Sequence, residues 1–431
     1  MDNLSKQPYK GARDFYPEDK RLHKWLLAKW RKVVERYGYE EYDAPILELT
    51  ELYKAKSGDE LVNEQTYSFK DRGGRDVSIR PEMTPSVSRM VAGRRQELSY
   101  PTRWYSIPNL WRYERPQKGR LREHWQLNVD IFGVATVDAD LELIIVARDI
   151  MHELGASNEM YTIKINSRKL VDIIMADYLE LDVGDTHQMV KLLDKHDKMS
   201  PETFEMEAKA VFEDQEEGWN KLQALLNAKS MGDLPDEIKT AEPIKEVQIL
   251  FTLLRENNVK NAVFDVSLMR GFDYYTDIVF EIFDNNEENS RSLFGGGRYD
   301  GLVGLFGVEP IPTVGFGMGD VTILDFLQSH SLLPELKSET DIYIVVIGDV
   351  LREAQGIANL LREGGLNVAV DITRKKVDRQ LKNASKKSVN YVLFVGEEEL
   401  NTEEFTLRNM DTGDEHKHTL AEITSSLQSE S

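Results

Sequence analysis

Segment 112–122, "RYERPQKGRLR", concentrates positive charge in a chain whose formal net charge is −21. Its only carboxylate is Glu114, and its basic residues are Arg112, Arg115, Lys118, Arg120 and Arg122. Guanidinium groups stay charged at physiological pH and offer paired N–H donors to phosphate oxygens. The segment therefore predicts a local site for phosphate.

An alternating segment, "HWQLNVDIF", follows at residues 124–132. Because side chains of a strand point to opposite faces in turn, Gln126, Asn128 and Asp130 should share one face. The other face carries Trp125, Leu127, Val129 and Ile131. An edge strand with a solvated polar face is the alternative interpretation. Beside the basic segment, we expect this polar face to hold a small polar ligand, read by Gln126 and Asp130.

The stretch "SIRPEMTPS" at residues 78–86 can present a carboxylate and a hydroxyl rigidly. Pro81 and Pro85 fix the backbone on either side of Glu82 and Thr84, a pair of groups that suits an ammonium ion. Glu82 could equally be a helix-start carboxylate near a capping threonine.

Two further stretches contain residues typical of ligand sites. The first, "LMRGFDYYTDIVFE" at 268–281, carries Arg270 ahead of two adjacent tyrosines, which could also be ordinary strand aromatics. The second, "LFGGGRYDGLVGLFG" at 293–307, has three consecutive glycines that permit close backbone approach, with Arg298 beside them.

Composition and motif searches exclude several classes of protein. The chain has no cysteine, so disulfides, thiolate nucleophiles and cysteine zinc sites are excluded, and a reducing cytoplasm is the expected location. No P-loop occurs, and "GFGMGD" at 315–320 lacks the Rossmann spacing. The longest apolar runs are strand-length and the first residues lack a hydrophobic signal region, so we expect no membrane partner.

The periodicity of the chain predicts an α+β fold. Residues 20–37 and 140–154 have helical spacing, whereas 44–135 and 275–283 read as short strands. Residues from about 168 to 260 are charged and helix-patterned, which indicates a helical insertion within a β-rich domain.

The last hundred residues change pattern after a linker near 329–340. "DIYIVVIG", "LNVAVDI" and "YVLFVG" read as strands that alternate with helices at 351–363 and 376–387, which predicts a small α/β domain. We expect the polar tail from about 411 to be weakly ordered.

These motifs, in this order, resemble the class II histidyl-tRNA synthetases. "YGYEEYDAPILE" with Pro45 resembles the class II dimer-interface motif, and "WRYERPQKGRLREHWQL" resembles the hairpin that holds ATP and the acceptor end of tRNA. "RGFDYYT" and "GGGRYDGL" are similar to segments particular to the histidine enzymes. The resemblance covers nearly the whole chain.

The resemblance implies three parts in four segments: a catalytic core at 1–167 and 263–332, a helical insertion at 168–262, and an anticodon-binding domain at 338–431. A class II antiparallel sheet with flanking helices would carry the active site. The implied reaction activates L-histidine with ATP and Mg²⁺ and transfers the histidyl group to tRNA(His). A homodimer is also implied, and the protein itself needs no resident metal.

Roles for individual residues follow from the same resemblance. Residues assigned to histidine are Glu82, Met83, Thr84, Arg112, Gln126, Asp130, Arg270, Tyr274 and Tyr275. Residues assigned to ATP are Arg112, Glu114, Arg120, Arg122 and Arg298. Arg112 and Arg270 would act on the reacting α-phosphate and are the catalytic candidates.

The third class II motif departs from the family pattern. That motif usually ends in Glu-Arg-Leu after its glycines, but "GDVTIL" here has Val321 and Thr322 at the acidic and arginine positions. The usual arginine contact to ATP is therefore missing or supplied elsewhere, with Arg298 as the candidate.

A basic run at 373–387, "TRKKVDRQLKNASKK", lies in the terminal domain. A solvated helix face is the ordinary interpretation of such a run, but in a chain this acidic we expect RNA contact. The residues assigned to tRNA are Arg374, Lys375, Lys376 and Arg379.

Two alternatives remain open from sequence. One is a non-enzymatic paralogue resembling the regulatory subunit that histidine biosynthesis borrowed from this fold, and only the altered third motif favours it. The other is a class II synthetase for a different amino acid, which "GGGRYDGL" and "RGFDYY" disfavour.

Overall fold

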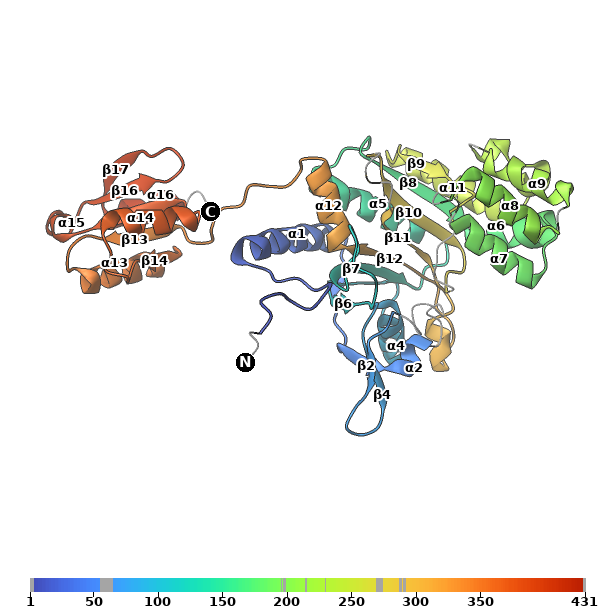
Figure 1. Cartoon of the computed structure of the whole chain (residues 1–431), viewed down its shortest axis with the longest axis horizontal. Coiled ribbons are helices and arrows are strands. Elements are labelled where there is room, and N and C mark those ends of the chain that lie inside the picture. Colours follow the sequence, from blue (N-terminus) through green and yellow to red (C-terminus); the bar gives the residue numbers. More distant parts are fainter. Residues whose placement is uncertain are drawn as a thin grey trace. The chain divides into compact units, whose positions relative to one another are not determined.

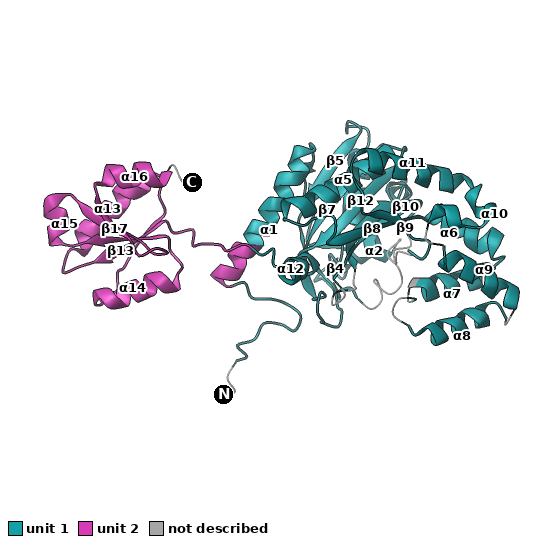
Figure 2. Cartoon of the chain, turned by 90° about the horizontal axis from the view of Figure 1, so that it is seen from above, with its two compact units in different colours: residues 1–15, 23–333 teal, residues 16–22, 334–431 magenta. Residues whose placement is uncertain are grey.

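The structure is a computed structural model. It describes residues 4–54, 65–194, 196, 199–213, 215–228, 230–268, 274–286, 289 and 292–428. Internal contacts divide the chain into two compact units: residues 1–15 with 23–333 form unit 1, and residues 16–22 with 334–431 form unit 2 (Figure 2). Within the described ranges, no helix is long and apolar enough to cross a membrane.

The chain before the insertion contributes both helices and strands (Figure 1). In order these are α1 (Pro17–Arg36), β1 (Glu40–Glu41), β2 (Leu47–Leu49), α2 (Thr50–Lys54), β3 (Ser68–Lys70), β4 (Asp76–Ile79), α4 (Thr84–Arg94), β5 (Thr102–Ser106), β6 (Asn109–Trp111), β7 (Glu123–Phe132), α5 (Asp138–Glu153) and β8 (Tyr161–Ser167). The predicted first helix is confirmed: acidic residues occupy its first turn, and Gly38 follows its end with φ +78.

The chain then builds the helical insertion and returns to the sheet. The insertion contains α6 (Arg168–Ile173), a π-helical turn η1 (Ile174–Tyr178), α7 (Val183–Asp194), α8 (Pro201–Val211), α9 (Glu216–Leu226), a 3-10 turn η3 (Met231–Asp233), α10 (Asp236–Lys239) and α11 (Glu242–Glu256). The returning elements are β9 (Ala262–Phe264), β10 (Ile278–Asp284), β11 (Ser292–Arg298), a 3-10 turn η5 (Val303–Phe306), β12 (Thr313–Gly319) and α12 (Asp320–Ser329).

A nine-stranded sheet organises unit 1. Its order is β1-β5-β7-β12-β11-β10-β8-β9, with β6 paired to β7. The pairs from β5 to β8 are antiparallel, and β7 lies inside the sheet between β5 and β12. The α+β class is confirmed, and the alternative of an edge strand for β7 is wrong.

One face of this sheet packs on the main apolar core. Leu127, Val129 and Ile131 of β7 are buried there with residues of α1, α5 and α12. The insertion has a separate apolar cluster, which includes Trp219 and Leu222 of α9. A smaller, three-stranded sheet has the order β2-β4-β3.

Unit 2 is a small α/β fold. Its elements are β13 (Ile342–Val346), α13 (Leu351–Glu363), β14 (Val368–Val370), α14 (Val377–Lys386), β15 (Tyr391–Val395), α15 (Glu397–Thr402), β16 (Phe405–Asn409), β17 (Glu415–His418) and α16 (Leu420–Gln428). The sheet order is β14-β13-β15-β16-β17, with parallel pairing around β13 and antiparallel pairing from β15 onward.

The expectation of a weakly ordered tail from about 411 is wrong. β17 pairs with β16, and α16 buries Ile423 and Leu427 in the core of unit 2. The spacing of these two residues by four places them on one face of a short helix, which the polar composition of the tail conceals.

Candidate active site

A cavity of about 1160 Å³ lies over the sheet face opposite the apolar core of unit 1. Its floor includes Gln126, Asn128 and Asp130, so the predicted polar face of β7 is a cavity wall and not a solvated edge. The predicted site residues that line it are Glu82, Thr84, Arg112, Glu114, Arg120, Gln126, Asp130, Tyr274 and Tyr275. Four separate stretches of sequence thus meet in one place.

Asp130 is a buried acid of the cavity floor. Its side chain is 4% exposed and accepts a hydrogen bond from the Tyr299 hydroxyl. Burial raises the pKa of the Asp130 carboxyl to about 7, and the Tyr299 hydrogen bond opposes that rise. A carboxyl poised near neutrality can pair with an imidazole N–H, because ionisation then depends on the ligand that arrives.

Glycines in β12 make room for the polar residues of β7. Gly315 pairs with Asp130 and Gly317 with Asn128. A Cβ on Gly315 would lie 2.0 Å from the Asp130 carboxylate, and one on Gly317 would lie 2.8 Å from the Gln126 amide. The glycine-rich stretch therefore gives space to the side chains that face the cavity.

Glu82 and Thr84 meet the cavity at the start of α4. Glu82 is 3% exposed and accepts a hydrogen bond of 3.2 Å from the Tyr274 hydroxyl. Thr84 is the first residue of α4, and Pro85 follows it. The side chain of Met83 instead packs in an apolar cluster, so its backbone is the part that remains for ligand contact.

The basic hairpin stands beside this floor. The Arg112 backbone N–H donates to the Arg122 carbonyl at 2.8 Å, and Gly119 turns the chain with φ +73. The Arg112 Nε donates to the Pro81 carbonyl at 2.9 Å. Pro81 directly precedes Glu82 in the sequence, so this bond joins the hairpin to the Glu82 segment. Arg120 forms an ion pair of 2.9 Å with Glu114, and all three charged side chains line the cavity.

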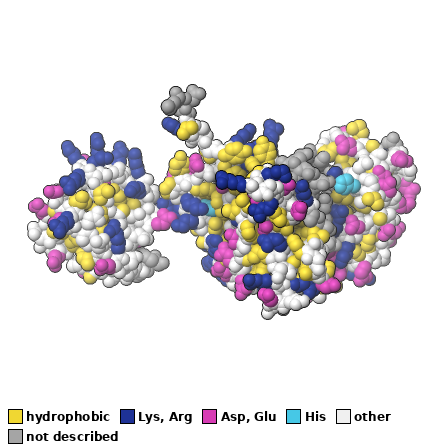
Figure 3. Space-filling view, turned by 90° about the horizontal axis from the view of Figure 1, so that it is seen from below, with side chains coloured by type: hydrophobic (Ala, Val, Ile, Leu, Met, Phe, Trp, Pro, Cys, Tyr) yellow, Lys and Arg dark blue, Asp and Glu magenta, His cyan; other side chains and the backbone are white. Residues whose placement is uncertain are grey.

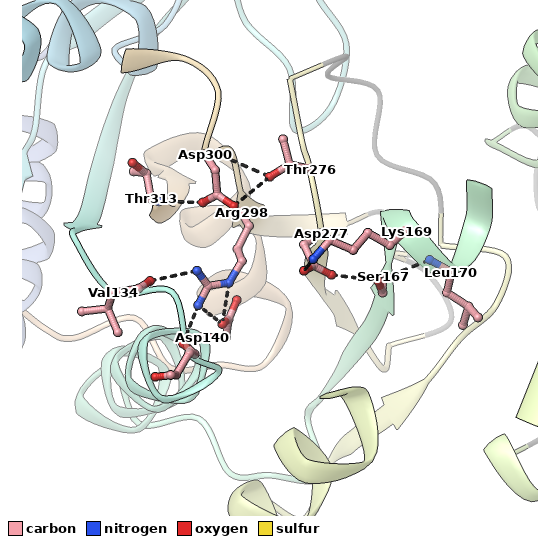
Figure 4. A network of polar contacts seen from close by, with 11 residues as sticks. Val134, Asp140, Ser167, Lys169, Leu170, Thr276, Asp277, Arg298, Asp300 and Thr313 are labelled. Atoms are coloured by element: carbon pink, nitrogen blue, oxygen red, sulfur yellow. Dashed lines mark hydrogen bonds and ion pairs between the residues drawn. The ribbon is translucent and has the colours of Figure 1, made fainter. Parts of the chain in front are cut away.

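Two predicted ATP contacts lie elsewhere. Arg122 is not among the residues lining the cavity: its guanidinium stacks 4.0 Å over the Tyr113 ring and donates to Tyr9. Arg298 points to the core face of β11, where it pairs with buried Asp140 and donates to the carbonyls of Val134 and Thr136 (Figure 4). The reason is strand alternation, because its neighbour Gly297 takes the opposite face.

Arg298 therefore does not replace the missing arginine of the third motif. Val321 and Thr322 do line the cavity, at the start of α12. The Thr322 hydroxyl donates to the Leu293 carbonyl at 2.8 Å, and a Cβ on Gly119 would lie 3.8 Å from the Thr322 methyl group. The hairpin tip thus approaches α12 where the family arginine would stand.

Several cavity residues were missed by the sequence reasoning. They include His124, Lys164, Glu281 and Tyr299. Burial, with nearby Arg112 and Arg13, lowers the pKa of His124 to about 3, so its imidazole is neutral. Tyr299 belongs to the "GGGRYDGL" motif. Its hydrogen bond to Asp130 joins segments that are distant in the sequence, so no local pattern predicts it.

Arg270 and the residues assigned to tRNA complete the set of predicted site residues. Arg270 falls outside the described residues. The residues assigned to tRNA, Arg374, Lys375, Lys376 and Arg379, belong to unit 2 and are all exposed there.

Comparisons with known proteins agree with this geometry. A family model described as histidyl-tRNA synthetase matches residues 11–321, and one described as an anticodon binding domain matches residues 341–430. A histidine–tRNA ligase of Leptospira biflexa is 42% identical over 431 residues, which is 99% of this chain and 98% of that protein. A histidine–tRNA ligase of Thermoplasma volcanium is 39% identical over 425 residues and covers 97% of each chain.

A solved structure shares the fold over the whole length. The histidyl-tRNA synthetase from Nostoc sp. PCC 7120 superimposes with a TM-score of 0.83 at 21% identity, covering 100% of both chains. With the family match over most of the sequence, this places the chain plainly: it belongs to the histidyl-tRNA synthetase family.

Proposed function

We propose that this protein charges tRNA(His) with histidine, using ATP. One observation carries the proposal: the Gln126–Asp130 face and the arginine hairpin border a single cavity in a chain of this family. In the first step the histidine carboxylate attacks the α-phosphate of ATP and expels pyrophosphate. In the second step a terminal ribose hydroxyl of the tRNA takes the histidyl group from the adenylate.

The histidine substrate is assigned to the part of the cavity between β7 and α4. Glu82 and Thr84 supply an acceptor carboxylate and a hydroxyl for the α-ammonium group, with the Met83 backbone between them. Gln126 and Asp130 face the imidazole, and Tyr274 and Tyr275 complete its surroundings. A site that pairs both ring nitrogens can reject analogues lacking them by about 10⁴–10⁵-fold.

ATP is assigned to the hairpin side of the cavity. Arg112 would contact the α-phosphate and the reacting carboxylate, and Arg270 would stabilise the same phosphoryl group from the 268–281 segment. Glu114 would lie near the adenine and Arg120 near the outer phosphates. Arg122, held against Tyr113, supports the hairpin.

Mg²⁺ is proposed to enter with ATP. Mg²⁺ prefers carboxylate and phosphate oxygens, and Glu281 lines the cavity floor on β10 with the Ser292 hydroxyl donating to it at 2.5 Å. Bound there, the ion would neutralise developing phosphate charge. The chain's own contribution is to orient both substrates and exclude water, because neither step needs a protein nucleophile.

Transfer RNA is assigned to the α14 side of unit 2. The loop before α14 and the helix itself expose Arg374, Lys375, Lys376 and Arg379. In Figure 3, lysine and arginine side chains gather along one edge of unit 2. The anticodon-binding family match over 341–430 supports this assignment, as does the net charge of −21, which makes a basic cluster unusual.

A homodimer is proposed through the small sheet. Four apolar side chains are about half exposed there: Leu47 and Leu49 on β2, Ile46 directly before β2, and Phe69 on β3. Exposed apolar surface of this kind marks an interface, and a second copy of the chain is the occupant that the class II resemblance implies.

Replacing Leu47 and Leu49 by glutamate should convert the dimer to a monomer. The two side chains share one face of β2, so both charges would be buried without a partner. Light scattering after gel filtration measures the mass. Leu360→Glu, on an exposed position of α13, is the matched control and should keep the dimer mass. A monomeric mass for the unaltered protein would contradict the proposal.

The regulatory-paralogue alternative is tested by catalysis. The intact protein should show ATP–pyrophosphate exchange that requires histidine, and Arg270→Ala should lower its rate by at least ~10²-fold, as for loss of one transition-state donor. Failure of exchange in the intact, folded protein would leave only the binding-module interpretation. We also expect the reaction to take place in the cytoplasm.

A further inference from the structure

The structure describes the connection between β9 and β10 in two segments, residues 265–268 after β9 and residues 274–277 before β10. In the sheet, β8 lies between β9 and β10, and both segments contact the end of β8, through Asn166 and Ser167. The chain leaves β8 for α6 at Ser167. Leu268, Tyr274 and Tyr275 of the connection line the cavity. We define Asn166–Lys169 as the β8–α6 junction.

Asn166 holds the first half of the connection. Its side chain is fully buried, and its amide nitrogen donates to the carbonyls of Val266 at 3.1 Å and Leu268 at 3.2 Å. Its amide oxygen accepts from the Ser167 N–H at 2.9 Å. The amide nitrogen therefore joins the connection to the junction, and the amide oxygen fixes the side chain within the junction.

Asp277 holds the second half. It is 5% exposed, and its carboxylate accepts from the Ser167 hydroxyl at 2.9 Å and pairs with the Lys169 ammonium (Figure 4). Its carbonyl accepts from the Arg168 N–H at 2.8 Å. The Ser167 hydroxyl also caps α6, accepting from the Leu170 N–H at 3.4 Å.

The next residue toward the cavity is tied to the sheet. The Thr276 N–H donates to the Arg298 carbonyl at 2.8 Å, and its hydroxyl contacts Asp300, whose carboxylate accepts from the Thr313 N–H (Figure 4). Tyr274, two residues earlier, donates to Glu82. Asp277 and Thr276 together therefore fix the backbone from which the Tyr274 side chain reaches Glu82.

The other side of the junction belongs to the insertion. Leu170 and Val171 of α6 are buried in the apolar cluster of the insertion, and Val266 of the connection is buried with them. Close-packed interiors have low compressibility and transmit strain. The junction thus connects the insertion with the residues facing the cavity.

We propose that the β8–α6 junction positions Tyr274 and Tyr275 for substrate histidine, with Asn166 and Asp277 as positioning residues. Through them, the helical insertion sets the geometry of the histidine pocket. This inference rests on the proposed function, because it assigns Tyr274 and Tyr275 to histidine. Neither Asn166 nor Asp277 lines the cavity, so their effect on the substrate is indirect.

Lys169→Gln, Asp277→Asn and the double variant test the inference by histidine-dependent pyrophosphate exchange. Each single variant should raise the KM for histidine by about 10-fold and leave the KM for ATP within about twofold, since small misplacements of a positioned group cost up to ~10²-fold. The double variant should resemble the worse single variant, because both act through one ion pair.

Lys221→Gln is the matched control. Lys221 pairs with Glu180 and Glu217 within the insertion, so the variant makes the same chemical change away from the junction. It should leave both KM values unchanged. Lys169 is 54% exposed, which keeps its variant testable if Asp277→Asn does not fold.

The failure of each idea has its own signature. No exchange by the wild-type protein would remove the proposed function itself. If the wild type is active and Lys169→Gln keeps the wild-type KM for histidine, with only a smaller folded fraction, the junction has a purely structural role. That result would overturn the inference. Equal increases in the KM for histidine and for ATP would also contradict it.

Discussion

Asp130 shows how one residue can join fold and chemistry. A strand inside the sheet carries it to the cavity floor, a glycine opposite leaves it space, and Tyr299 donates to it. Burial raises the pKa of its carboxyl to about 7. Without a ligand, burying this carboxyl lowers the free energy of unfolding.

Replacing Asp130 by asparagine should therefore stabilise the ligand-free protein relative to the wild type, and this gain should grow as the pH rises. Below about pH 4 the carboxyl is protonated in both the folded and the unfolded chain, so the variant gains little. Between about pH 4 and 7 the unfolded carboxyl ionises while the folded one stays protonated, which progressively destabilises the wild type. Urea unfolding at pH 5 and pH 8 measures the difference.

The gain of Asp130→Asn should be larger at pH 8 than at pH 5. Histidine binding should move the other way, with kcat/KM lower by about 10- to 100-fold for a lost charge-assisted hydrogen bond of about 1.5–3 kcal/mol. A stability gain that is the same at both pH values would contradict the raised pKa.

At the residue scale, the sequence predicts which side chains of a strand share a face, but not always which face meets the core. Period two in the 124–132 segment correctly placed Gln126 and Asp130 on one face and the apolar residues on the other. The same rule puts Gly297 and Arg298 on opposite faces of β11. The sequence does not show which of these faces meets the core, because that depends on the pairing of Gly297 with Gly315 in the distant strand β12.

At the scale of elements, the space above the sheet depends on β12. Gly315→Ala should displace Asp130, because the added Cβ would lie 2.0 Å from its carboxylate oxygen. We expect a fall of about 10²-fold or more in kcat/KM for histidine, and a loss of about 1–3 kcal/mol in the free energy of unfolding, as for overpacking. Exchange kinetics and urea unfolding measure the two effects.

Gly301→Ala is the control for that substitution. An added Cβ at Gly301 has no atom within 4 Å, so the same chemical change should leave activity and stability near wild type. Wild-type kinetics in Gly315→Ala would show that the β12 glycine does not shape the histidine pocket.

Long periodic elements followed from the sequence, but contacts between distant elements did not. The helix at 351–363 and the strand at 342–346 stand as the periodicity predicts. The order of β12 between β7 and β11, by contrast, is a long-range pairing that local propensity does not encode. The tail was missed because α16 exposes most of its residues to solvent and buries only two.

At the scale of the whole molecule, activation and tRNA recognition are assigned to separate units. Replacing Lys375 and Lys376 by glutamate should raise the KM for tRNA(His) in charging by about 10-fold or more, because phosphate contacts carry much of RNA affinity. Histidine-dependent pyrophosphate exchange, which needs no tRNA, should stay near wild type. A matched pair of assays on one preparation separates the two outcomes.

Salt provides the control for that experiment. If the basic run contacts phosphates, the KM difference between variant and wild type should shrink as salt rises. Equal charging by the variant at low salt would show that the run is a solvated helix face.

A crystal structure with histidine and a non-hydrolysable ATP analogue tests the central claim most directly. The account predicts the imidazole within hydrogen-bond distance of Asp130 and Gln126, with the α-phosphate against Arg112. Clear density for either substrate away from this junction of hairpin and strand would contradict it.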